Sequence, residues 1–281
     1  MIRDWSLRRR VSVVLSLLLS LILSALMLSV VFLFTVFNSG YMVSKAESSQ
    51  YSGYMRDNIR EELASGVMSG FDSTFYENVI TENLVAADLK QEILRVYHPE
   101  REPFDKEAFT VYLYKTFLRE AKNLEGDEIS EENNNALIYL AEISTDIYYD
   151  NIHLWMANAV TPMLSNGKTI CIVTAMLSLV LLAFTIWMMF RQNRAKRDRL
   201  RYMIYGVSAA FIAISIPAIL LKLSGKINNI AIANRGLHRT IEVCSNEIIN
   251  IVLLCCIFLV ACVIVMAEMF RNSGHRITYW N

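Results

Sequence analysis

Charged residues are scarce in this sequence: they occupy 19% of its 281 positions, whereas about 25% is usual for soluble domains. Four stretches carry no charge at all: residues 11–37, 169–190, 203–221 and 248–267. Each is close to the roughly 20 apolar residues that a bilayer-spanning helix needs. The sequence therefore predicts an integral membrane protein, and it argues against a soluble enzyme, a nucleic-acid-binding protein and a secreted disulfide scaffold.

The motifs of common catalytic and cofactor sites are also missing. There is no P-loop, G-x-G-x-x-G, G-x-S-x-G or C-x-x-C sequence, and the four histidines lack H-E-x-x-H spacing. Ionisable residues inside a membrane usually mark ion paths or proton relays, but here Lys222, Glu247 and Glu268 lie only at the ends of the apolar runs. We therefore predict a non-enzymatic protein without catalytic residues, bound cofactor or metal, and without proton-coupled transport.

The basic residues are concentrated next to the apolar runs on one side. They precede the first run, separate the second from the third, and follow the fourth: Arg3, Arg8, Arg9, Arg10, Arg191, Arg194, Lys196, Arg197, Arg199, Arg201, Arg271 and Arg276. Short loops rich in lysine and arginine stay in the cytoplasm. We therefore predict a multi-pass protein of the plasma membrane with both termini in the cytoplasm, and an uncleaved first run that acts as a signal-anchor.

The segment Asn38–Ser165 is then extracytoplasmic. It contains 22 acidic and 10 basic residues, a net charge of −12. Its apolar residues recur at helical spacing, and its prolines and glycines are few. The pattern predicts helices over Tyr41–Val67, Phe75–Tyr97, Asp105–Leu124 and Ser130–Met163, with Asp105 and Ser130 as N-caps and with Phe117 and Trp155 in the interior. Four amphipathic helices of this length can bury one another in a bundle.

The five cysteines lie outside this segment, so it is expected to be held together by packing without disulfides. This usage fits a bacterial plasma membrane better than a disulfide-rich secreted domain. A bridge between Cys171 and Cys244 is the alternative that we weigh against free, apolar packing cysteines.

A run of acidic residues within the segment, Glu125, Asp127, Glu128, Glu131 and Glu132, raises the question of a cation site. The run lacks EF-hand spacing. We therefore favour a solvated loop followed by acids at the start of a helix.

Small residues recur every third or fourth position in two of the apolar runs. The positions are Ser12, Ser16, Ser20 and Ser24 in the first run and Gly206, Ala210 and Ala213 in the third. Such faces let helices approach closely in a membrane. We favour packing within the chain over the alternatives, which are oligomerisation or a serine-lined conduit. Pro217 in the third run is a candidate hinge.

The loop between the third and fourth runs is basic, with Lys222, Lys226, Arg235 and Arg239. Opposite charges attract, so we predict that Arg235 and Arg239 dock against acidic residues of the bundle. Contact with anionic lipid headgroups is the alternative.

The expected fold is thus an all-α integral membrane protein with four transmembrane helices and an extracytoplasmic helical-bundle domain inserted between spans 1 and 2. The boundaries that we expect are a cytoplasmic N-terminus (1–10), span 1 (11–37), the helical domain (38–168), span 2 (169–190), a basic cytoplasmic loop (191–202), span 3 (203–221), an outer loop (222–247), span 4 (248–269) and a cytoplasmic C-terminus (270–281).

This outline resembles the four-span permeases that partner ABC ATPases in bacterial cell-wall remodelling, and its helical outer segment is similar to that of chemoreceptor-type sensors. Our leading hypothesis is an interaction or sensory module whose acidic outer domain binds a protein partner or ligand. The alternative is an oligomeric pore, or a transporter subunit working with an ABC ATPase. Beyond the lipid bilayer, we expect a protein partner or a homo-oligomer, and no nucleic acid.

Overall fold

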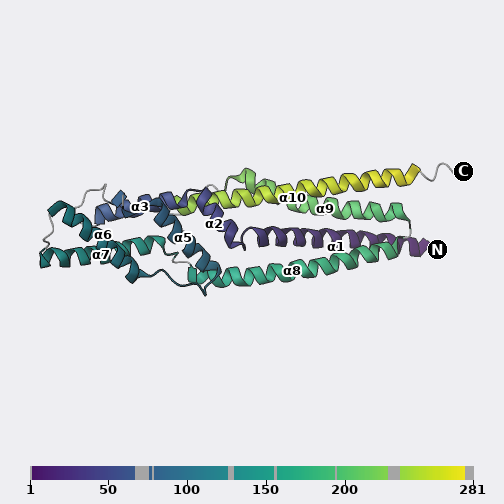
Figure 1. Cartoon of the computed structure of the whole chain (residues 1–281). Coiled ribbons are helices and arrows are strands. Elements are labelled where there is room, and N and C mark those ends of the chain that lie inside the picture. Colours follow the sequence, from purple (N-terminus) through teal and green to yellow (C-terminus); the bar gives the residue numbers. More distant parts are fainter. Residues whose placement is uncertain are drawn as a thin grey trace. The chain divides into compact units, whose positions relative to one another are not determined.

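The computed structural model describes residues 2–66, 76–77, 79–125, 130–154, 157–193, 195–226 and 235–275. Among these residues the regular structure is helical and contains no strand (Figure 1). The helices are α1 (Ile2–Phe34), α2 (Ser39–Ser48), α3 (Tyr51–Gly66), α5 (Glu82–Tyr97), α6 (Lys106–Glu125), α7 (Glu131–Ile152), α8 (Ala157–Gln192), α9 (Lys196–Ser224) and α10 (Arg235–His275). The prediction of an all-helical chain is confirmed for the described part.

The described part contains four helices long and apolar enough to cross a membrane. They cover Arg8–Phe34, Ala159–Gln192, Lys196–Ser224 and Gly236–Ser273, and their positions agree with the four charge-free runs. The chain is therefore consistent with a multi-pass membrane protein.

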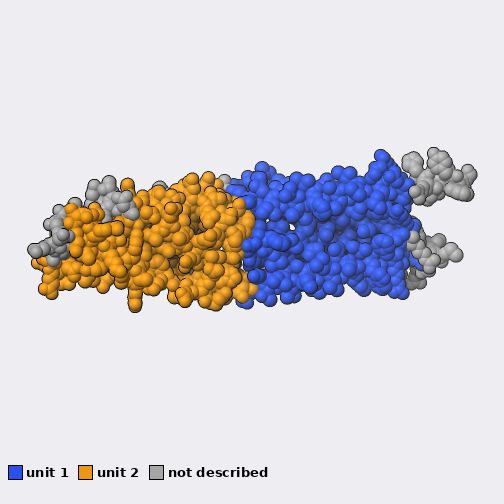
Figure 2. Space-filling view, viewed as in Figure 1, with its two compact units in different colours: residues 1–38, 166–230, 244–281 blue, residues 39–165, 231–243 orange. Residues whose placement is uncertain are grey.

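The chain divides into two compact units, which Figure 2 distinguishes by colour. Unit 1 comprises residues 1–38, 166–230 and 244–281, and unit 2 comprises residues 39–165 and 231–243. Helix α10 thus contributes its first turns to unit 2 and the rest of its length to unit 1. The sequence pattern had assigned residues 235–247 to an outer loop, whereas the structure describes them as helix.

Unit 2 has a hydrophobic core of its own. It is built from large side chains of α3, α5, α6 and α7, and Leu237 of α10 packs against it. Phe117, Ile59 and Tyr148 are completely buried there. Burying a large apolar side chain stabilises a fold by about 1.5–3 kcal/mol relative to exposure to water. The predicted interior position of Phe117 is confirmed, while Trp155 lies outside the described residues.

The helix caps of unit 2 follow the predicted chemistry. The side chain of Asp105 accepts a hydrogen bond from Ala108 N at 2.9 Å, and Ser130 Oγ accepts one from Asn133 N at 3.2 Å. Each satisfies a backbone donor that the first helical turn leaves free. Helix α5 ends at Tyr97, directly before His98 and Pro99, as expected from the clash that a proline makes with a continuing turn.

Three predicted helix boundaries were wrong. The helix expected over Tyr41–Val67 is interrupted between α2 and α3, where Gln50 has φ 58°, a left-handed conformation that breaks helical hydrogen bonding. The second helix begins at Glu82, later than expected, because Thr81 caps it by accepting from Leu84 N. The fourth helix was expected to run from Ser130 to Met163 and to end near Pro162–Gly167, but α7 ends at Ile152 and α8 continues through Pro162. Pro162 is the sixth residue of α8 and lies beyond its first turn, so it removes one hydrogen bond within the helix without ending it.

Unit 1 contains α1, α9 and most of α8 and α10. Within it α1 and α9 pack most closely, and a small cluster of Leu15, Leu19, Met189 and Tyr202 joins them to α8. In the most apolar part of α8 only 11% of the residues are buried, compared with 28% in α1 and in α9. The remaining apolar side chains of α8 point outward, as lipid-facing side chains would.

Candidate functional site

The start of α10 is seated against the break between α2 and α3. A Cβ atom at Gly236 would lie 2.7 Å from the ring of Tyr51 and 3.1 Å from Tyr54 Cβ, so a larger residue would require the buried Tyr51 ring to shift. One turn further on, the hydroxyl oxygens of Thr240 and Ser49 are buried and 2.7 Å apart, and one of them donates to the other. Burial raises the pKa of the Tyr51 phenol to about 12. We call this contact, in which Gly236 and Thr240 of α10 pack against Ser49, Tyr51 and Tyr54, the seat of α10. It makes the first turns of α10 part of unit 2.

A second feature of unit 2 is a buried carboxylate on α5. Glu92 is only 5% exposed. Arg95 holds it in a two-point contact, with Nη2 donating to Oε1 at 2.6 Å and Nε donating to Oε2 at 2.8 Å. The hydrogen bond with Glu92 is also the main cause that raises the pKa of Arg95. A buried charge of this kind is expensive unless it is paired and hydrogen-bonded.

His153 joins this pair from the end of α7. Its Nδ1 lies 2.9 Å from Glu92 Oε1 and 3.2 Å from Arg95 Nη2, so the two contacts compete for one nitrogen, which can either donate or accept. The imidazole ring stacks on Tyr149 with centroids 4.9 Å apart, and Lys106 Nζ lies 3.9 Å from the centre of the Tyr149 ring. The result is a polar cluster that ties α5, α6 and α7 together.

Next to this cluster, Tyr148 donates a hydrogen bond to Asp88 Oδ2 at 2.6 Å. Tyr148 is fully buried and stacks on Phe109, with ring centroids 4.3 Å apart. Burial raises the pKa of Asp88, and the hydrogen bond from Tyr148 offsets part of that effect. Burial and the nearby Asp88 carboxylate both raise the pKa of Tyr148, which therefore stays protonated and keeps its role as donor.

A pocket of about 20 Å³ opens between these groups. It is lined by the three carboxylates of Asp88, Glu92 and Glu102 and by the side chains of Gln91, Phe104 and Ile152. A water molecule needs about 10–15 Å³ of such space. The pocket therefore has room for a water but not for an organic ligand. In the described part of the chain, no group of three or more His, Cys, Asp or Glu side chains is arranged to hold a metal ion.

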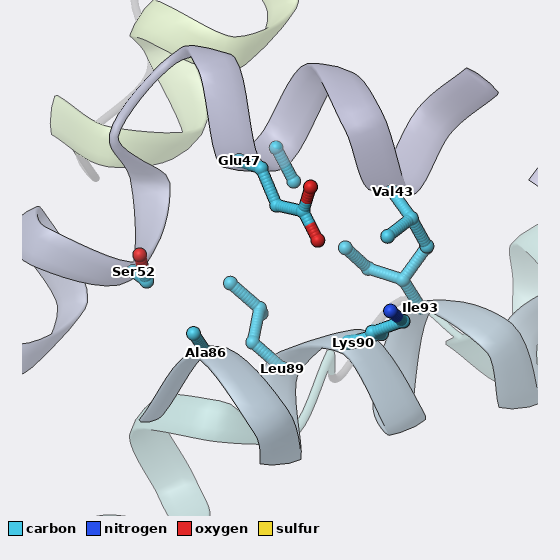
Figure 3. Close-up of a pocket in the computed structure, with 8 residues that line it drawn as sticks. Val43, Glu47, Ser52, Ala86, Leu89, Lys90 and Ile93 are labelled. Atoms are coloured by element: carbon cyan, nitrogen blue, oxygen red, sulfur yellow. The ribbon is translucent and has the colours of Figure 1, made fainter. Parts of the chain in front are cut away.

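A second small pocket, of about 10 Å³, lies between α2 and α5 (Figure 3). The carboxylate of Glu47 from α2 and the side chains of Leu89 and Ile93 from α5 point toward it. Its size leaves no space for a ligand larger than water. Neither of these two pockets therefore has room for a partner larger than water.

The outer surface of unit 2 carries exposed aromatic side chains. Tyr112 on α6 and Tyr139 on α7 are 45% and 65% exposed. Exposed tyrosines are common in protein interfaces, because the ring supplies apolar area and the hydroxyl supplies a hydrogen bond.

The small-residue positions predicted in the first and third runs are largely brought together. Ser12, Ser16 and Ser20 are buried in α1, and Gly206 and Ala210 are buried in α9. A Cβ atom at Gly206 would lie 2.9 Å from the backbone oxygen of Ser16 and 2.7 Å from the side chain of Leu19. The serine face of α1 thus lies directly against α9 at Ser16.

The other predicted span positions are less involved in this pairing. Ser24 is half-buried, and Ala213 is exposed. Pro217 lies inside α9 on an exposed position.

The predicted docking arginines are placed as follows. Arg239 forms an ion pair with Glu242 of its own helix at 3.1 Å, and the side chain of Arg235 lies outside the described residues. The described contact between α10 and the rest of unit 2 is instead made by Gly236, Leu237 and Thr240. All five cysteines are free thiols, so the alternative of a bridge between Cys171 and Cys244 is not realised.

The acidic run is described only at its end. Glu131 and Glu132 are exposed in the first turn of α7, and the side chains of the other three acids lie outside the described residues.

Sequence reasoning missed the cluster around Glu92, although a signal was present. The buried residues of α5 are Val85, Leu89, Glu92 and Val96, so Glu92 occupies the apolar stripe of its helix. A carboxylate on an apolar stripe, with an arginine three residues later, predicts a paired buried charge.

Comparison with models of known protein families, with curated proteins and with solved structures finds no match for this chain.

Proposed function

We propose that the protein is a non-enzymatic, multi-pass plasma-membrane protein of bacterial type, and that unit 2 is an extracytoplasmic module that binds a protein partner or ligand. In this proposal both termini lie in the cytoplasm. The acidic character of residues 38–165, with a net charge of −12, supports a solvated domain outside the membrane.

The observation that carries the proposal is the seat of α10. The same helix contributes Gly236 and Thr240 to the packing of unit 2 and continues as one of the four apolar helices. A domain that served only as a spacer would need no such close fit. In a sensory or interaction module, this seat gives a binding event on unit 2 a direct covalent path to a membrane span.

The exposed tyrosines of α6 and α7 support a binding area on the outer surface of unit 2. Both described pockets are too small for a ligand, whereas Tyr112 and Tyr139 are exposed. We therefore expect a macromolecular partner that contacts α6 and α7.

The pore alternative draws less support. Ser12, Ser16 and Ser20 are buried, and the hydroxyls of Ser16 and Ser20 donate to carbonyl oxygens of their own helix. A conduit lined by this face would require α9 to move away from α1.

Photo-crosslinking in intact cells distinguishes the two functions. A benzophenone amino acid replaces Tyr112 or Tyr139 in unit 2, and Leu223 of α9, which is 79% exposed, serves as the matched position in a span. A discrete adduct with a different protein from the two tyrosine positions, and not from Leu223, supports the module. Adducts that form only from Leu223, and only with a second copy of the chain, would favour an oligomeric pore and contradict the proposal.

A further inference from the structure

The arginines at one end of unit 1 lie on aromatic rings. Arg197 of α9 lies 5.0 Å from the ring centre of Phe270 on α10, and Arg199 of α9 lies 4.6 Å from that of Phe190 on α8. Arg191 stacks on Trp187 of its own helix at 5.5 Å. Guanidinium groups stack on rings in a way that lysine ammonium groups do not.

These contacts bring four helix ends together. Ser12 near the start of α1 donates to Asn193 after α8 at 3.2 Å, which adds α1 to the group of α8, α9 and α10. Further basic side chains lie on the same helix ends: Arg8, Arg9, Arg10, Lys196, Arg201 and Arg271. The acidic residues described at this end include Asp198 and Glu268. Glu268 is already paired with Arg271 at 2.7 Å.

The stacked arginines keep their charge free for a ligand. Among the salt bridges that the structure describes, none involves Arg191, Arg197 or Arg199. Within the same described part, Arg199 Nε is buried and lacks a hydrogen-bond partner. A planar guanidinium without a carboxylate presents donors that match the oxygens of a phosphate group.

The position of these arginines selects a lipid as the source of phosphate. Arg191 directly follows the apolar run 169–190, and Arg199 precedes the run 203–221 by four residues, roughly 6 Å along a helix. This is the depth of the headgroups next to the hydrocarbon core. Directly beyond them, α8 exposes apolar side chains such as Phe184 and Val180, which acyl chains of the same molecule would cover.

We propose that this basic end of unit 1 binds anionic phospholipids, with Arg197 and Arg199 as the main phosphate ligands, and that the bound headgroups hold α8 and α10 against α9. Such a bridge would add to the packing of α8 and α10, which is less close in unit 1 than that of α1 with α9. The inference does not depend on what unit 2 binds.

Thermal unfolding of the purified full-length protein in a neutral detergent tests this proposal. Three additions are compared: phosphatidylglycerol, phosphatidylcholine with the same acyl chains, and inorganic phosphate. We expect a saturable stabilisation by phosphatidylglycerol and little effect of the other two. Equal stabilisation by both lipids would contradict the proposal, and so would an effect of inorganic phosphate as large as that of phosphatidylglycerol.

Matched variants then locate the site. R197Q/R199Q should weaken the apparent affinity for phosphatidylglycerol on the order of tenfold, whereas R8Q/R9Q, which removes the same charge from the exposed start of α1, should weaken it much less. R197K/R199K keeps the positive charge but loses the planar set of N–H donors of the guanidinium group. Its apparent affinity for phosphatidylglycerol should be closer to that of R197Q/R199Q than to that of the original chain. If the glutamine variant fails to fold, native mass spectrometry of the lysine variant decides the question, because retention of phosphatidylglycerol at the original level would overturn the assignment.

Discussion

The side chains that pack the inside of unit 2 differ in kind from those that pack the inside of unit 1. The core of unit 2 is made of large residues such as Phe117, Tyr148 and Ile59, all of them fully buried. The closest pair in unit 1, α1 and α9, meets through Ser16 and Gly206. In water, burying large apolar groups is the main driving force for folding. In lipid that force is missing between helices, and close approach of small residues takes its place.

The difference extends to polar groups. Unit 2 buries the carboxylate of Glu92 and satisfies it with Arg95 and His153. The described spans bury serine hydroxyls, of which Ser16 and Ser20 donate to nearby carbonyl oxygens of the same helix. The kind of residue that is buried thus distinguishes the two units. Large apolar residues and a paired charge are typical of a core formed in water, and small residues with locally bonded hydroxyls are typical of helices packed in lipid. The following predictions test that distinction.

The largest effect is expected in the core of unit 2. Replacing Phe117 with alanine should reduce the free energy of unfolding of this unit by about 3–5 kcal/mol, because the ring is fully buried and its loss leaves a cavity. Hydrogen exchange on the full-length protein measures this separately for each unit. The matched control is Tyr139→Ala, which removes an exposed ring of similar size. Equal effects of the two substitutions would show that α6 is placed incorrectly.

In unit 1 the equivalent test adds an atom instead of removing one. Gly206→Ala should destabilise the pairing of α1 and α9 by about 1–3 kcal/mol, because the new Cβ meets the backbone oxygen of Ser16 at 2.9 Å. Thermal unfolding in detergent is the measurement. Gly167→Ala is the control, since its Cβ meets only the ring of Phe37, which can turn away. A Gly206→Ala protein as stable as the control would mean that α1 and α9 do not pack at this point.

The third prediction concerns pH and the buried Asp88. Because burial raises its pKa in the folded state, the folded protein binds this proton more readily than the unfolded chain does. The stability that protonation of Asp88 contributes is therefore fully present at a pH below the ordinary aspartate pKa. It is lost as the pH rises through the raised pKa of the folded state. Asp88→Asn, which can still accept the hydrogen bond from Tyr148, should stabilise unit 2 at neutral pH and flatten the dependence of its stability on pH above the ordinary aspartate range. Asp150→Asn, on an exposed position, is the control, and an identical pH profile for the two variants would refute the role of Asp88.

The smallest effect is expected at Arg239. Its ion pair with Glu242 is half exposed and lies within one helix, so Arg239→Ala should change stability by only about 0–0.5 kcal/mol. The neighbouring Thr240→Val should cost about 1 kcal/mol, because it removes the buried hydroxyl contact with Ser49. Protease cleavage within residues 39–66 reports both. Faster cleavage of the Arg239 variant than of the Thr240 variant would support the prediction that cations dock α10 against the bundle.

Much of the fold could be predicted from the sequence, because its strongest signals are local. The four apolar runs predict the long helices, and capping residues such as Asp105 and Ser130 predict where α6 and α7 begin. Breaks between helices were harder to predict. The break between α2 and α3 lies at Gln50, a left-handed residue that is neither glycine nor proline, so the residue type does not predict it. Gly236 of α10, which is far away in the sequence, packs against the same segment.

The candidate site was less predictable for the same reason. Glu92 and Arg95 could have been identified from their spacing on α5, but His153 reaches them from α7, 58 residues beyond Arg95. The pairing of Asp88 with Tyr148 likewise depends on how two helices are aligned. Charge alone suggested that Arg239 would reach the bundle, whereas steric fit at Gly236 and a hydroxyl pair at Thr240 make the described contact.

The central claim is that unit 2 lies in water outside the cytoplasm while the basic ends of the spans lie inside. Labelling single cysteines with a membrane-impermeant maleimide tests it most directly, on a chain whose five native cysteines are replaced. Ser130 and Ala195 are both exposed, so Ser130→Cys should be labelled in intact cells and Ala195→Cys only after permeabilisation. Labelling of Ala195→Cys in intact cells, together with protection of Ser130→Cys, would contradict the account.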